Sequence, residues 1–405
     1  MIYTAKKIQT IYLMLLIGNT LAASFIWGIN TIFLLSAGLS NFEAFAANAF
    51  FTAGMVLFEI PTGLIADTRG RKTSYILGCL TLLISTVLYM LLWQYQAEFW
   101  AWAVVSVFIG LGFTFFSGAL EAWLVDALNS VNYKEDLDSV FAKGQIAGGV
   151  SMLIGSIAGG VAAQVGNLGT PYLIRSGLLL AVVIAAYIFM EDIGFKPEKS
   201  MHPIKDIKKV LSSSIEHGIK NQKVRWLMLA APFSAGVGVY VFYALQPYLL
   251  QIYGDDTAYG VAGLVAALMA GSQIVGGLAA PKLKKIFKSR LNFILTCTTI
   301  SSIALIFTGI IPNFWVVLAA ISLWGFTGSL VMPVRQTYIN KHIPSKQRAT
   351  VLSFDSLMGS SGGVVIQPAL GKVADIYSYG QSYIAAACLQ ALAIPLIIKA
   401  KLEDK

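Results

Sequence analysis

The sequence predicts an all-α membrane protein with twelve transmembrane helices in two pseudo-symmetric six-helix bundles. Of its 405 residues, 57% are hydrophobic and only 12% are charged, which is more apolar surface than a soluble core can bury. Apolar stretches of about 20 residues, the length that a helix needs to cross a bilayer, recur along the whole chain. Lys and Arg gather in the short polar segments between these stretches, as expected for a multi-pass protein.

Twelve apolar stretches qualify as spans, six on each side of a polar interval. The first six lie at residues 9–37, 43–66, 73–93, 99–127, 141–165 and 171–190, and the second six at 226–252, 259–280, 291–311, 314–339, 351–374 and 383–399. We therefore expect an N-terminal bundle (1–190), a linker (191–225) and a C-terminal bundle (226–405). Within the linker, basic and apolar residues alternate at helical spacing over 202–211, which favours an amphipathic helix on the inner membrane surface over a partner-binding site.

The Lys and Arg pattern also predicts the orientation. With the N-terminus in the cytoplasm, all of the 29 Lys and Arg residues fall on the cytoplasmic side except Arg175, Arg335 and Lys372, which lie within or at the edge of spans. We expect a monomer in the inner (cytoplasmic) membrane with both termini in the cytoplasm. The net charge of +9 is then explained by topology, so no nucleic-acid partner is expected.

The two halves show signs of duplication at one offset, 213 residues. Gly112-Phe113-Thr114 recurs as Gly325-Phe326-Thr327, Gly63 maps onto Gly276, and Arg71-Lys72 maps onto Lys284-Lys285. The acid is not repeated, because Asp67 maps onto Ala280. Repeated halves with a site between them are a common plan of transporters.

A charged turn lies between the second and third spans. It reads Gly63-Leu-Ile-Ala-Asp67-Thr-Arg69-Gly70-Arg71-Lys72. Positive-inside cations alone would explain a turn here, but an acid at the membrane edge is costly unless it is paired or caps a helix. The turn therefore predicts a specific site.

This turn resembles the loop of the major facilitator superfamily, Gly-x-Leu-Ala-Asp-Arg-x-Gly-Arg-Lys. The match covers Gly63, Ala66, Asp67, Gly70, Arg71 and Lys72, with Ile65 and Thr68 as departures. The resemblance implies a transporter in which the Asp and Arg of the loop join an acid at the inner end of span four, here Asp126, and latch the halves in the outward-facing state. Asp67 would face the positive N-terminal end of span eleven.

Bacterial twelve-span drug/proton antiporters of this superfamily often carry Gly-Pro-x-x-Gly-Gly in span five. Here the segment is Gly155-Ser156-Ile-Ala-Gly159-Gly160, with Ser156 in place of the proline. We expect its glycines to pack closely on span eight, whose candidates are Gly271, Gly276 and Gly277; generic small-residue packing is an equal alternative. The Arg that such relatives carry in span four is absent, because Ser106 stands four residues before Gly110.

Ionisable groups within the membrane are expected to pair or to function. The candidates for proton coupling are Glu59, Asp67, Glu121 and Asp126. Glu121 in span four and Arg335 in span ten lie at nearly equivalent heights, so we hypothesise that they meet across the inner cavity; pairing inside one half is the alternative. Asp355 starts span eleven, where capping of the helix is the simplest interpretation.

A set of aromatic and polar residues on cavity-lining spans favours a lipophilic or amphiphilic substrate over a sugar. The candidates are Asn19, Trp27, Asn30, Glu121, Tyr240, Tyr243, Gln246, Trp324, Arg335 and Gln367. Ordinary packing is the alternative for any single ring.

No enzyme signature, cofactor motif or metal-ligand cluster is present, and a phosphate loop is missing, so catalytic, cofactor and metal sites are not expected. The sequence predicts a proton-coupled efflux antiporter of multidrug type that works by alternating access on a small-molecule substrate. A lipid-linked substrate flippase, an uptake symporter and a non-transporting membrane receptor on the same fold remain as alternatives.

Overall fold

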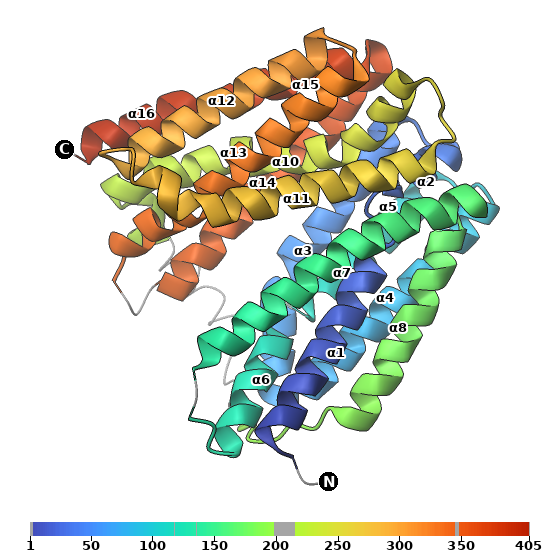
Figure 1. Cartoon of the computed structure of the whole chain (residues 1–405), viewed down its shortest axis with the longest axis vertical. Coiled ribbons are helices and arrows are strands. Elements are labelled where there is room, and N and C mark those ends of the chain that lie inside the picture. Colours follow the sequence, from blue (N-terminus) through green and yellow to red (C-terminus); the bar gives the residue numbers. More distant parts are fainter. Residues whose placement is uncertain (1–2, 117, 135, 198–214, 345–347, 405) are drawn as a thin grey trace. The chain divides into compact units, whose positions relative to one another are not determined.

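The computed structural model describes residues 3–116, 118–134, 136–197, 215–344 and 348–404. Within these ranges the chain is helical and contains no strand. Figure 1 colours the helices along the sequence, from blue at the N-terminus to red at the C-terminus. They are α1 (Ala5–Ser24), α2 (Asn30–Ser36), α3 (Asn41–Arg69), α4 (Arg71–Gln94), α5 (Phe99–Thr114), α6 (Ala119–Ser130), α7 (Leu137–Val165), α8 (Thr170–Phe189), the short π-helix η1 (Ile215–Ile219), α10 (Gln222–Tyr253), α11 (Tyr259–Lys284), α12 (Arg290–Ile310), α13 (Phe314–Lys341), α14 (Arg348–Ile376), α15 (Tyr379–Ala391) and α16 (Ala393–Glu403).

Ten helical stretches among the described residues are long and apolar enough to cross a membrane, so this is a multi-pass membrane protein. The predicted first span, formed by α1 and α2, and the predicted eleventh span, α14, are not among the ten. The count of twelve therefore stays a prediction. The linker helix predicted at 202–211 lies outside the described residues.

Three of the predicted spans are each divided into two helices. Span one breaks between α1 and α2, where the backbone bonds from Trp27 to Ser24 and from Ile29 to Ile26 are tightened i to i−3 bonds. Span four breaks between α5 and α6, where Gly118 adopts the left-handed conformation with φ +70°. Span twelve breaks between α15 and α16 at Leu392. Hydrophobicity alone does not report such breaks, because both sides of each break are apolar.

Short polar side chains start several helices by binding the free backbone N–H groups of the first turn. Asn221 accepts a bond from the N–H of Lys223 at 3.1 Å, and Asn313 accepts from those of Trp315 and Val316. Such caps matter in a membrane protein, because helix ends near lipid have little water to satisfy them.

The helices form two compact units. One unit holds residues 1–37, 53–203 and 259–267, and in it α1 packs on α7 and α8 while α4 packs on α5 and α8. The other unit holds residues 38–52, 204–258 and 268–405, and in it α10 packs on α14 and α16 while α12 packs on α13 and α15. We call these the first and the second unit.

Two helices, α3 and α11, are shared between the units. The first turns of α3 belong to the second unit, where the carboxylate of Asp375 accepts hydrogen bonds from the backbone N–H groups of Asn41 and Phe42, both at 2.9 Å. The first turns of α11 belong to the first unit, where Gly263 lies against Gly160 of α7. The two units therefore differ from the predicted N-terminal and C-terminal bundles, which were divided at the linker.

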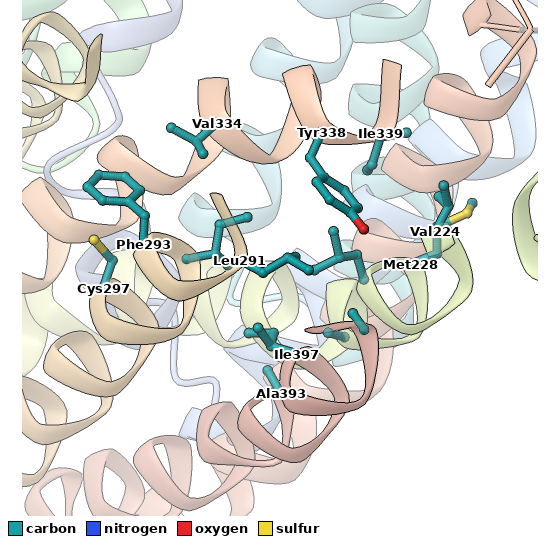
Figure 2. Packing of buried hydrophobic residues seen from close by; sticks show 14 of the residues in the cluster. Val224, Met228, Leu291, Phe293, Cys297, Val334, Tyr338, Ile339, Ala393 and Ile397 are labelled. Atoms are coloured by element: carbon teal, nitrogen blue, oxygen red, sulfur yellow. The ribbon is translucent and has the colours of Figure 1, made fainter. Parts of the chain in front are cut away.

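Each unit has its own apolar core. In the first unit, side chains of α1, α4, α6 and α8 meet around the fully buried Trp123 and Tyr75. In the second unit, α10, α12, α13 and α16 contribute the cluster that Figure 2 shows, with Phe293, Cys297, Val334 and Ile397 among its members.

Candidate functional site: a charge network at one end of the first unit

The turn between α3 and α4 is built on Gly70. Helix α3 ends at Arg69 and α4 begins at Arg71, and Gly70 between them has φ +106°. A Cβ atom at Gly70 would lie 2.1 Å from Oδ2 of Asp192. Both the backbone conformation and the close carboxylate therefore require a glycine at this position.

Arg71 lies between two carboxylates. Its Nη1 is 2.5 Å from Oδ1 of Asp67, one turn earlier, and its Nε is 3.7 Å from Oδ2 of Asp126 on α6. The Arg71 side chain is 19% exposed, but those of Asp67 and Asp126 are 41% and 34% exposed, so water partly screens these attractions. The structure brings the three predicted residues together within one unit, and their role as a latch stays a prediction.

A third acid, Asp192, completes this network, and sequence reasoning missed it. It follows α8, and its Oδ1 accepts the backbone N–H of Lys72 at 2.8 Å, with the backbone N–H of Arg71 also bonded to it. Asp192 therefore caps the N-terminus of α4, where the helix dipole favours a negative charge. Burial raises the pKa of Asp192, although these backbone bonds and the cations of Lys72 and Arg71 act in the opposite direction.

The segment that carries Asp192 is held firmly on the ends of the neighbouring helices. Trp123 of α6 donates its indole N–H to the carbonyl of Glu191 at 2.7 Å, and Lys72 donates to the carbonyl of Tyr187 at 2.8 Å. Gly194 has φ +75°, and a Cβ there would lie 2.5 Å from the carbonyl oxygen of Asp126. The available sequence signal was an acid pair directly after span six and a glycine two residues later, inside what was predicted to be a linker.

The four acids proposed for proton coupling differ in their surroundings. Asp67 and Asp126 share Arg71, and Glu59 lies half-buried two turns before Asp67 on α3. Glu121, in the first turn of α6, is half-buried and near enough to Tyr12 and Tyr75 to act on them electrostatically. No residue in the described part of the chain gives Glu121 a side-chain hydrogen bond or an ion pair.

Arg335 is paired inside the second unit. Its Nη2 is 2.6 Å from Oδ1 of Asp355 and 2.9 Å from the carbonyl oxygen of Leu227, and its Nη1 contacts the second carboxylate oxygen of Asp355. This ion pair agrees with the alternative given in the sequence analysis, in which Arg335 pairs with a residue of its own half. Glu121 belongs to the other unit, so its meeting with Arg335 stays a prediction.

Several residues proposed for the substrate cavity are bonded within their own unit. Tyr240 donates to Ser382 at 2.5 Å, Trp324 to Gln390 at 3.1 Å, and Gln367 to the carbonyl of Gly363 at 3.0 Å. Asn30 accepts a bond from Tyr172. The remaining candidates are buried or half-buried: Asn19 and Trp27 in the first unit, and Tyr243 and Gln246 in the second. A single cavity lined by the whole set stays a prediction.

The glycines of span five pack closely, mainly on α1. Cβ atoms at Gly155 and Gly159 would lie 1.9 Å from Oγ of Ser24 and 1.8 Å from the carbonyl oxygen of Phe25. Gly160 faces α11, where its neighbours are Tyr259 and Gly263 and not the expected Gly271, Gly276 or Gly277. Gly276 lies against α13, whereas Gly271 and Gly277, like Gly63 on α3, have open space beside them within the described structure.

Comparison with known proteins decides the family. The sequence model of the Major Facilitator Superfamily matches residues 10–368, which is most of the chain. The chain belongs to the Major Facilitator Superfamily. It is therefore a membrane transporter by family. An uncharacterized MFS-type transporter of Methanocaldococcus jannaschii is 20% identical over 363 residues, 90% of each chain.

Solved transporters share the fold. The structure of the nucleoside transporter NupG superposes with a TM-score of 0.75 at 12% identity, covering 98% of this chain and 99% of that one. The POT family transporter PepTSo gives a TM-score of 0.74 at 12% identity over 100% and 98% of the two chains. At such low identity these likenesses show the fold and leave the substrate open.

Proposed function

We propose that this superfamily member is a proton-coupled secondary transporter that exports lipophilic or amphiphilic small molecules by alternating access. The observation that carries the proposal is Glu121, an acid within an apolar span that has no hydrogen-bond or ion-pair partner among the described residues. An ionisable group in a membrane span that lacks such a partner is expected to serve a function. Asp67 and Asp126, in contrast, share Arg71 as an ion-pair partner.

We also propose that the charge network around Arg71 acts as a latch at the cytoplasmic face. The orientation assumed here follows the Lys and Arg pattern of the loops. Three acids gather on one turn, and each is within reach of a cation or a helix N-terminus. Protonation or movement of any of them changes the balance of charge at a place where the chain is tightly packed.

The energy available from proton entry is adequate for such a cycle. One elementary charge that crosses the membrane potential releases about 2.3 kcal/mol per 100 mV. Protonation of Glu121 from the outside and release to the cytoplasm would couple this energy to the movement of substrate.

Uptake symport is the second candidate. The solved neighbours include a nucleoside transporter and a POT family transporter in complex with 5-aminolevulinic acid, which suggest uridine and 5-aminolevulinic acid as probes. In addition, Ser106, which stands where drug antiporters often carry a membrane Arg, is fully buried and bonded to Tyr89. The antiporter mechanism therefore cannot be carried over directly.

The test uses purified protein in liposomes that enclose a pH-sensitive dye. Ethidium serves as the probe for efflux, and uridine and 5-aminolevulinic acid serve as probes for uptake. Antiport predicts that substrate and protons move in opposite directions, and symport predicts the same direction. In either case the Glu121→Gln variant should lose proton movement, whereas the matched Glu98→Gln variant, at an exposed acid before α5, should keep it. Full proton coupling in Glu121→Gln would refute its role.

A further inference from the structure

The loop between α11 and α12 is the second-half counterpart of the turn around Gly70, and its cations have a different environment. The offset of 213 residues places Lys284-Lys285 at the positions of Arg71-Lys72, and Ala280 at the position of Asp67. In the first unit Arg71 pairs with Asp67 and Asp126, and Asp192 accepts the backbone N–H of Lys72. In the second copy the corresponding acid has been replaced by a buried alanine.

Residues 282–290 carry five cations and no acid. These are Lys282, Lys284, Lys285, Lys288 and Arg290. None of the five forms an ion pair or a side-chain hydrogen bond with any residue that the structure describes. Five like charges this close repel each other unless an outside anion compensates them.

The loop is nevertheless anchored to the core. Its side chain Phe287 packs inward, whereas Ile286 is exposed. Phe287 packs edge-to-face on Phe293, at 5.2 Å between ring centroids, and so anchors the loop to the core cluster of Figure 2. Its neighbour Ile286 is 75% exposed, between the exposed Lys285 and Lys288. One apolar side chain projecting among cations at the end of two membrane-length helices is typical of a segment that lies at a lipid headgroup layer.

We propose that the loop Lys282–Arg290 binds the headgroups of anionic phospholipids in the cytoplasmic leaflet, with Ile286 inserted at the boundary with the acyl chains. The charge supports this occupant, since the surface of that leaflet is negative and attracts Lys and Arg next to spanning helices. The geometry supports it as well, because the loop joins two membrane-length helices and therefore lies at headgroup depth. The proposal rests on the orientation assumed above and is independent of the substrate and of the direction of transport.

The experiment measures the binding of headgroup-labelled dioleoyl phosphatidylglycerol and of dioleoyl phosphatidylcholine to the purified full chain in detergent. The wild type is expected to bind phosphatidylglycerol at least about tenfold more tightly than phosphatidylcholine. A variant with Lys282→Gln, Lys285→Gln and Lys288→Gln should lose at least about tenfold in affinity for phosphatidylglycerol and keep its affinity for phosphatidylcholine. The same three positions changed to Arg should keep both affinities.

A matched control separates the loop from the net charge of the protein. The variant Lys6→Gln, Lys143→Gln and Lys220→Gln removes three exposed lysines from other predicted cytoplasmic positions. Its affinity for phosphatidylglycerol should stay within about twofold of the wild type, because these lysines are not clustered. If the triple variant does not fold, the single variant Lys285→Glu, at an exposed position, provides a second test. It should show the same loss of affinity for phosphatidylglycerol. Equal binding of the two lipids by the wild type, or an equal loss in the control and loop variants, would overturn the proposal.

Discussion

Replacing Gly70 by Ala probes the local geometry that holds the charge network together. The added Cβ would meet the carboxylate of Asp192 at 2.1 Å, and the residue would have to keep φ +106°. That conformation costs a non-glycine residue about 1–3 kcal/mol, and a displaced helix cap costs about 1 kcal/mol more. We therefore expect Gly70→Ala to lower the free energy of unfolding by about 2–4 kcal/mol.

A double-mutant cycle with Asp192→Ala separates the two contributions. Asp192→Ala alone removes the cap and should cost about 1 kcal/mol. In the double variant the clash is absent and the cap is lost only once, so the total should fall short of the sum of the single effects by about 1 kcal/mol. The backbone strain at residue 70 remains in both variants that carry Ala there.

The assay is equilibrium unfolding of purified protein in mixed micelles, with the wild type and the three variants measured side by side. Gly63→Ala is the matched control, since Gly63 lies inside α3 with open space at its Cβ position. It should leave stability unchanged or raise it by up to about 1 kcal/mol, because alanine favours a helix interior. The reasoning fails if Gly70→Ala is as stable as Gly63→Ala, or if the double variant shows simple additivity.

Three further predictions concern stability and pH. Arg335→Leu leaves the buried carboxylate of Asp355 unpaired and should cost about 3–5 kcal/mol, whereas Arg335→Met combined with Asp355→Leu should recover most of the loss in the same unfolding assay. Gly159→Ala places a Cβ 1.8 Å from a backbone oxygen at the end of α1 and should cost about 1–3 kcal/mol, while Gly148→Ala, with open space around it, should be neutral; similar melting temperatures for both would contradict the contact. Burial raises the pKa of Asp192, so the folded state holds this proton more tightly than the unfolded state does, and the stability that the group contributes is greatest below its ordinary pKa of about 4. Wild type should therefore lose stability relative to Asp192→Asn as the pH rises from about 4 through the folded pKa, and parallel stability curves for the two proteins would speak against that shift.

The amino-acid sequence by itself determined the class of protein and the position of the charged turn. Runs of apolar residues the length of a bilayer, with cations between them, allow only helices that satisfy their own backbone bonds. The pairing of Asp67 with Arg71 is also local, since residues four apart near one helix end are neighbours in space. These features depend on short stretches of chain, so spacing and composition were enough to predict them.

Only the tertiary structure decided which distant residues meet. Asp192 reaches the turn from 120 residues away, Arg335 takes Asp355 as its partner, and the glycines of span five face mainly α1 instead of α11. Each of these contacts joins different helices, and many helix arrangements would satisfy the same apolar pattern. One arrangement is selected because it allows close backbone approach and pairs charges away from water, where an unpaired charge is costly. Both conditions depend on contacts between distant residues, so the order of residues along the chain does not reveal them.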